Sequence, residues 1–206
     1  HYGSKMDHVI YLHGFLSSPK SDKARLVAEY VTRNYPNIKL HVPTLPGVPA
    51  KAVEVVEQLI STILSNKSCN KDTPNNALGF IGSSMGGFLS TYFVETYGGK
   101  AVLVNPAIEP FNLLKDYFGE HTNHYTDEVF TIDKNSVAQL LKLHKITKKG
   151  DPNYLVYLQK EDETLDYHLA EMKYGSDRCI VEEGGNHSFV GLEKYLSDII
   201  RFLSHQ

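Results

Sequence analysis

Short apolar runs alternate along the chain with longer segments in which apolar residues recur every three or four positions. The runs are rich in Val, Ile, Leu and Tyr and show little alternation of apolar and polar residues. This pattern is typical of strands in a sheet whose two faces are both covered. It predicts buried strands at residues 8–12, 38–42, 78–81, 101–105, 154–159 and 179–183.

Two of the intervening segments, residues 52–64 and 192–203, have an apolar face at helical spacing. Strands that alternate with helices in this way form βαβ units. We therefore predict a three-layer α/β fold, with a mostly parallel sheet of about six strands and helices on both faces. Ligands of such folds bind at the carboxyl edge of the sheet.

Residues 106–151 break this rhythm because the segment is too long for a simple crossover and is rich in His, Tyr, Lys and Asn. We predict a partly helical, cap-like excursion over the carboxyl edge of the sheet, bordering the site. The remaining organisation is simple. Residues 6–206 are expected to form one domain, and residues 1–5, which precede Met6, are interpreted as a cloning remnant.

Composition and charge exclude some classes of function. The net charge of -3 and the isoelectric point near 6.4 give no basic surface for nucleic acid. No apolar run is long enough to span a membrane. The two cysteines, Cys69 and Cys179, have no metal-binding or redox spacing, so we expect a reducing, cytoplasmic setting.

The segment "LGFIGSSMGGFLS" changes from a strand pattern to a helix pattern at two adjacent serines. A nucleophile at the tip of a very tight strand–helix turn needs glycine two residues before and two residues after it. Ser84 has Gly82 and Gly86 at these positions, whereas Ser83 does not. Ser84 is thus the candidate nucleophile, and the amide of Met85 is a candidate oxyanion donor. The alternative is a glycine-rich turn without reactivity.

The segment "YLHGF", residues 11–15, directly follows the first strand. In folds with such a nucleophile, the loop at this place supplies the second oxyanion amide. We assign that amide to Phe15, with Gly14 allowing close approach of the backbone. His13 is interpreted as a hydrogen-bonding brace of the loop.

The segment "EGGNHSF", residues 183–189, follows the last strand. Its glycines allow the loop to bring His187 onto Ser84, and His187 comes last in the chain order Ser, Asp, His. His187 is therefore the candidate base. His121 and His124 have a loose H-x-x-H spacing, but no carboxylate or cysteine completes a metal site there, so we expect no metal.

The segment "LQKEDETLD", residues 158–166, supplies the acid that would orient the histidine. Glu161, Asp162, Glu163 and Asp166 compete for this role, with Asp166 the alternative that stays open. Asp162 is the candidate because it is expected in the loop after the strand. Thr164 is expected to be the N-cap of the next helix. That would place Asp166 in the first helical turn, where a carboxylate interacts favourably with the helix dipole.

Taken in order, "YLHGF", "GSSMGG", "VNPA", "EDETLDY" and "EGGNHSF" resemble the YqiA-type esterases, small bacterial members of the α/β-hydrolase superfamily. The resemblance runs from about Met6 to the last helix. It implies a carboxylic-ester hydrolase with Ser84 as nucleophile, Asp162 as acid and His187 as base. Acyl transfer by these three residues is expected to need neither a metal nor an organic cofactor. One departure is Glu161, since the family carries glycine before the acid.

The expected substrate is a small-molecule ester or thioester, in a pocket whose walls we assign to Leu16, Phe88, Phe111 and Tyr117. Two alternatives stay open. An acyl-CoA thioesterase would use the same three residues and a basic patch such as "KITKKG", residues 145–150. A non-catalytic binding module on the same fold is the second.

Overall fold

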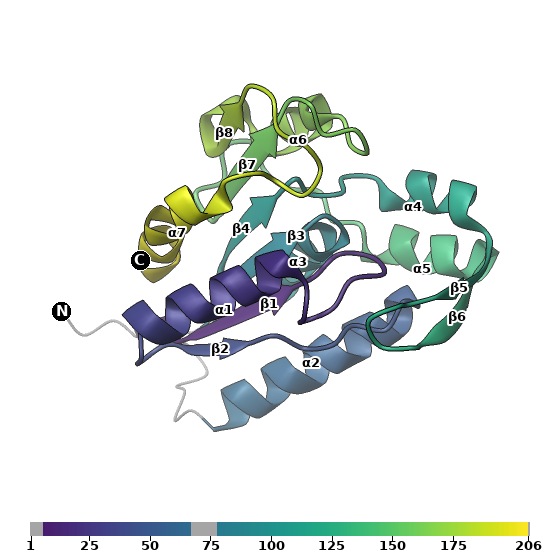
Figure 1. Ribbon diagram of the computed structural model, residues 1–206, viewed down its shortest axis with the longest axis horizontal. Coiled ribbons are helices and arrows are strands. Elements are labelled where there is room, and N and C mark those ends of the chain that lie inside the picture. Colours follow the sequence, from purple (N-terminus) through teal and green to yellow (C-terminus); the bar gives the residue numbers. More distant parts are fainter. Residues whose placement is uncertain (1–5, 67–77, 206) are drawn as a thin grey trace.

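The computed structural model describes residues 6–66 and 78–205 (Figure 1). The interpreted cloning remnant and Cys69 lie outside these residues. Six strands form one parallel sheet in the order β2-β1-β3-β4-β7-β8. All six predicted strands are confirmed. They are β1 His8–Leu12, β2 Lys39–His41, β3 Leu78–Ser83, β4 Lys100–Val104, β7 Tyr154–Gln159 and β8 Cys179–Glu182.

Helices cover both faces of the sheet, as predicted (Figure 1). Successive side chains of a strand point to opposite faces, so Val9 and Tyr11 belong to one core and Ile10 and Leu12 to the other. The first core is closed by α1 Asp22–Asn34 and α7 Leu196–Ser204. The second includes α2 Pro49–Ser65, α3 Met85–Tyr97, α5 Lys134–Leu143 and α6 Tyr167–Tyr174.

The two segments with helical period are helices, with small differences at their ends. Helix α2 begins at Pro49, because proline is favoured in the first turn, where its missing N–H costs nothing. Residues 192–203 begin with a 3-10 turn, η3 Leu192–Tyr195, before α7 starts. No helix in residues 6–66 or 78–205 is long and apolar enough to cross a membrane.

The excursion, residues 106–151, contains more than helices. It has α4 Pro110–Leu113, η1 Leu114–Tyr117, and an antiparallel hairpin of β5 Gly119–Thr122 and β6 Val129–Ile132, before α5. The hairpin was not predicted because its strands are largely polar and exposed, and only Phe130 and Ile132 are buried. Figure 1 shows α4, α5 and the hairpin grouped together, on the side of the molecule away from both termini.

Two side-chain hydrogen bonds hold the excursion against loops of the main sheet. The amide of Asn123 donates to the carbonyl oxygen of Ser17 at 2.9 Å, in the loop after β1. The carboxylate of Glu128 accepts from the backbone N–H of Gly47 at 3.0 Å, in the segment after β2. The hairpin is therefore fixed next to the loop that follows the first strand.

Candidate active site

Ser84 lies at the turn between β3 and α3, in a backbone conformation that is rare for a residue with a side chain. Its φ is 55° and its ψ is -118°, and such strained geometry occurs where the surrounding structure enforces it. The backbone N–H of Ser84 donates to Val104 O at 3.1 Å, and its carbonyl oxygen accepts from the N–H of Ala107 at 2.9 Å. The turn is thereby tied to β4 and to the start of the excursion.

Packing explains the two glycines around Ser84. A Cβ atom on Gly86 would overlap the carbonyl oxygen of Leu12 in β1, and one on Gly82 would overlap the carbonyl oxygen of Gly86. Both obstacles are backbone atoms, which cannot rotate away. The spacing G-x-S-x-G is thus required by contact between β1, β3 and α3.

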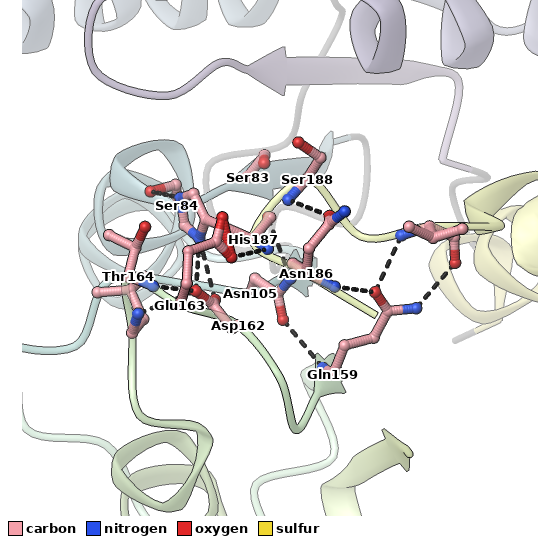
Figure 2. Close-up of polar contacts among 12 residues, drawn as sticks. Ser83, Ser84, Asn105, Gln159, Asp162, Glu163, Thr164, Asn186, His187 and Ser188 are labelled. Carbon is pink, nitrogen blue, oxygen red and sulfur yellow. Dashed lines mark hydrogen bonds and ion pairs between the residues drawn. The ribbon is translucent and has the colours of Figure 1, made fainter. Parts of the chain in front are cut away.

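His187 connects Ser84 to Asp162 (Figure 2). Its Nε2 lies 3.1 Å from Ser84 Oγ, and its Nδ1 lies 2.9 Å from Asp162 Oδ2 and 3.1 Å from Oδ1. These three residues come from the ends of β3, β7 and β8, which meet at the carboxyl edge of the sheet. The structure therefore brings together the three side chains that sequence reasoning selected.

Asp162 is held in a nearly closed site. Its side chain is only 2% exposed, and Oδ1 also accepts hydrogen bonds from the N–H groups of Thr164 at 2.8 Å and Leu165 at 2.9 Å. Burial raises the pKa of this carboxyl group, but the hydrogen bonds from His187, Leu165 and Thr164 together lower it below its ordinary value. The carboxylate is thus the form that faces His187 Nδ1 at neutral pH.

Two polar side chains that the sequence analysis did not identify, Asn105 and Gln159, hydrogen-bond the loop that carries His187 (Figure 2). The Asn105 amide donates to the carbonyl oxygens of Asn186 and His187 at 2.9 and 3.1 Å, and its Oδ1 accepts from the N–H of Gln159. Oε1 of Gln159 accepts from the N–H groups of Asn186 and Val190 at 3.1 and 2.9 Å. The available signal was a polar residue at the carboxyl end of each of two buried strands.

A further contact fixes the same loop from its other side. The carboxylate of Glu163 accepts from the backbone N–H of His187 at 2.9 Å. Glu161, the departure from the family pattern, is exposed, and its N–H donates to Gly184 O at 3.1 Å. Glu163 therefore contacts the loop of His187 through its carboxylate, whereas Glu161 contacts it through its backbone N–H.

The loop after β1 passes directly beside Ser84. A Cβ atom on Gly14 would lie 3.4 Å from the Cβ of Ser84. His13 is buried, with its Nδ1 2.8 Å from Gly14 O, and its Nε2 accepts from the N–H of Leu45 at 2.9 Å. Burial lowers the pKa of His13, against a smaller opposite effect of the Gly14 carbonyl, so its neutral form braces the loop.

Ser84 and His187 line a cleft, together with Phe15 and Met85. Of the four residues expected in its walls, Leu16 and Tyr117 line it. Phe88 does not line the cleft, because α3 directs its side chain into the hydrophobic core, where it is 3% exposed. Phe111 packs edge-on against His144. The excursion contributes Ala107, Leu113, Leu114, Tyr117 and Tyr125 to the cleft.

A smaller apolar cavity of about 30 Å³ adjoins the cleft and shares part of its wall. Both are lined by Gly14, Phe15, Leu16, Met85 and Leu114. The cavity extends under the loop after β1 toward Leu45 and Leu140. An apolar group could thus extend past the cleft on this side of the sheet.

One expectation about a neighbouring segment was wrong. Asp166 is itself the N-cap of α6, where its side chain accepts from the N–H of His168, and Thr164 is not the cap. Both residue types are good caps, so the pattern could not separate them. The lysines of residues 145–150 do not line the cleft.

Among the residues that the structure describes, no group of three His, Cys, Asp or Glu side chains is arranged to hold a metal ion. His121 contacts the carbonyl oxygen of Tyr117 and stacks on Phe130. The His121 side chain therefore packs within the excursion.

The sheet order, the strained turn and the residues at the carboxyl edge define the α/β-hydrolase fold. The chain belongs to the uncharacterised protein family UPF0227, whose sequence pattern matches residues 8–204. This match confirms the resemblance to YqiA-type esterases.

Solved structures of other proteins share this fold. Est1E from Butyrivibrio proteoclasticus is 14% identical, with 98% of this chain and 88% of that chain covered and a TM-score of 0.66. Mouse alpha/beta hydrolase domain-containing protein 10 is 14% identical, with coverages of 98% and 92% and a TM-score of 0.62. S-formylglutathione hydrolase from Staphylococcus aureus is 18% identical, with coverages of 97% and 82% and a TM-score of 0.58. At these identities the likeness concerns the fold.

The packing at the turn predicts different costs for two glycines of the same strand. Gly82→Ala should lower the free energy of unfolding by about 2 kcal/mol or more, because the new methyl group meets backbone. Gly79→Ala is the matched control, because its Cβ would lie 3.3 Å from the end of the Leu203 side chain, which can move. This substitution should change the free energy of unfolding by less than about 1 kcal/mol. Urea denaturation measures both. Equal losses would contradict this account of the turn.

Proposed function

We propose that this protein is a serine hydrolase of carboxylic esters, with Ser84 as nucleophile, His187 as base and Asp162 as acid. The observation that carries the proposal is the position of His187, which lies within hydrogen-bond distance of both partners through its two different ring nitrogens. A carboxylate on Nδ1 favours the tautomer whose Nε2 can accept the serine proton.

The first half of the reaction forms an acyl-enzyme. Nε2 of His187 takes the proton of Ser84 Oγ as the oxygen attacks the ester carbonyl, and Asp162 stabilises the imidazolium that results. The tetrahedral intermediate then collapses, and the imidazolium gives its proton to the departing alcohol. In the second half, His187 activates water, which releases the acid and restores the Ser84 hydroxyl.

The amides of Phe15 and Met85 are proposed to stabilise the oxyanion. Both residues line the cleft beside Ser84, and Met85 begins a helix, where free N–H groups and the dipole favour negative charge. Within the described residues, neither amide donates a backbone hydrogen bond to the protein. Both are therefore available to a bound carbonyl oxygen.

The excursion is proposed to act as a small cap that limits substrate size. Its side chains Leu113, Leu114, Tyr117 and Tyr125 form one wall of the cleft. Thioesters would react by the same chemistry, but the basic segment expected for coenzyme A binding does not line the cleft, which favours esters. A binding module without activity would have no reason to keep the strained backbone of Ser84.

A fluorophosphonate probe tests the nucleophile. The wild-type protein should gain one probe adduct, because the reagent traps a serine that an adjacent base activates. Fragmentation mass spectrometry should place the adduct on Ser84. The variant Ser84→Ala should take no label, whereas Ser83→Ala should still be labelled at Ser84, whatever its rate. A folded wild-type protein without an adduct, or an adduct on Ser83, would overturn the proposal.

Substitution of the two aspartates tests the acid. In Asp162→Asn, the carbonyl oxygen of the new side chain can keep the hydrogen bonds from Thr164 and Leu165. Its NH₂ group then faces His187 Nδ1 and selects the wrong tautomer, so kcat should fall by about 10³-fold or more.

Asp166→Asn is the matched control for this loop. Asparagine caps helices about as well as aspartate, so stability should change by less than about 1 kcal/mol, and turnover should stay near that of the wild type. Steady-state kinetics and thermal denaturation measure the two effects. If Asp166→Asn is the inactive variant, the assignment of the acid is wrong.

A further inference from the structure

Lys23 makes an unusual contact beside the candidate nucleophile. Its Nζ donates a hydrogen bond of 2.7 Å to Ser83 Oγ, on the residue that directly precedes Ser84. Ser83 is 7% exposed and also hydrogen-bonds the side chain of Tyr11. Within residues 6–66 and 78–205, Lys23 forms no ion pair with a carboxylate. A positive charge is thus held next to Ser84 by a neutral hydroxyl group.

This position is unfavourable for a lysine on grounds of stability alone. Lys23 is the second residue of α1, where the helix dipole disfavours a positive charge. Burial of an ammonium group without a charged partner is also costly. Burial lowers the pKa of Lys23 to about 8, although the charge of Asp162 acts in the opposite direction. The lysine nevertheless stays predominantly protonated at neutral pH.

The cleft has different chemistry on the two sides of the sheet. On the side of α2 and α3 its walls include Leu16, Leu114 and Met85, and the apolar cavity continues there. On the side of α1 and α7 they include Lys23, which is the one Lys or Arg that lines the cleft among the described residues. The carboxylates in the lining, Asp22 and Glu193, are exposed at the rim.

We propose that Lys23 binds an anionic group of the substrate, so that the natural substrates are esters that carry a carboxylate. The ester carbonyl lies at Ser84, the carboxylate reaches Lys23 on the α1 side, and an apolar group occupies the side of the excursion. This inference rests on the proposed function and names its substrate class. Ser83, held by Tyr11, positions the ammonium group.

The surroundings favour a carboxylate over a group of higher charge. One lysine supplies the positive charge, and the rim carries Asp22 and Glu193, which repel a dianion. The ammonium group has three N–H donors, of which Ser83 uses one. The others suit the two oxygen atoms of a carboxylate through charge-assisted hydrogen bonds.

Matched pairs of esters test the proposal on the wild-type protein. In the first pair, 4-nitrophenyl hexanoate and mono-4-nitrophenyl adipate differ only in a terminal methyl or carboxylate on the acyl side. In the second, methyl 4-acetoxybenzoate and 4-acetoxybenzoate differ on the alcohol side. For one pair, kcat/KM should favour the anionic ester by about tenfold or more, as expected of a charge-assisted hydrogen bond. The responding pair identifies the side that carries the carboxylate.

Variants assign the preference to Lys23. In Lys23→Met, the ratio of kcat/KM for the anionic and neutral esters should fall by about tenfold. Arg25→Met is the matched control, because it removes an exposed positive charge of the same helix that does not line the cleft. Its ratio should stay within about twofold of wild type. If Lys23→Met does not fold, Lys23→Gln removes the charge and keeps a donor for Ser83.

Several results would overturn this inference and leave the proposed function intact. The first is a wild-type protein that the probe labels but that prefers neither anionic ester. The second is an equal loss of kcat/KM for the anionic and the neutral ester in the Lys23 variants. The third is a change of the ratio in Arg25→Met as large as that in Lys23→Met. An equal loss would mean that Lys23 only positions the catalytic residues. A wild-type protein that takes no label and hydrolyses no ester would instead overturn the proposed function.

The pH dependence of the same ratio gives a second readout. The preference should be present below pH about 8 and be lost above it, because Lys23 then loses its charge. The titratable groups around the lysine are Tyr11 on β1, Asp162 and His187 on the loops after β7 and β8, Asp22 on α1, and Glu193 on η3. Tyr11 stays neutral because burial raises its pKa. Both esters of a pair would react through the same three residues, so a pH dependence that the two esters share cancels in the ratio. A ratio independent of pH across this range would contradict the role of Lys23.

Discussion

Strand β1 and helix α3 meet so closely that no side chain fits between them, and the candidate site depends on this contact. Gly86 packs on the carbonyl oxygen of Leu12, and Gly82 packs on the carbonyl oxygen of Gly86. Ser84, midway between the two glycines, makes this turn with a positive φ. The energetic cost of that backbone is offset by the six-strand sheet, whose central strands are buried on both faces.

The local features of the molecule could be predicted from the sequence. Each strand is an apolar run that needs no partner to be recognised, and the elbow needs only glycines at fixed spacing. The three residues of the candidate triad follow the ends of three such strands, so parallel topology alone brings them to one edge. For this reason the sequence could place Ser84, Asp162 and His187 near one another, and in the structure their side chains are within hydrogen-bond distance.

What could not be predicted depends on contacts between distant segments. Asn105 and Gln159 support the histidine loop through hydrogen bonds that span many residues, and the polar hairpin is fixed by Asn123 and Glu128. The direction of Phe88 depends on how α3 is rotated, which the even distribution of apolar residues on that helix does not specify. Lys23 gave no sequence signal because its significance comes from Ser83, sixty residues away.

The order of the strands also distributes the candidate triad unequally over the sheet. Ser84 follows β3, which is central and fully buried, whereas His187 follows β8, a partly exposed strand that pairs with β7 alone. Native proteins open locally, and edge elements with fewer buried contacts open at lower free energy than the core. Opening of β8 and its loop would separate His187 from Ser84 while the rest of the sheet stays folded. The contact between His187 and Ser84 is therefore expected to be lost on heating at temperatures where the central strands are still folded.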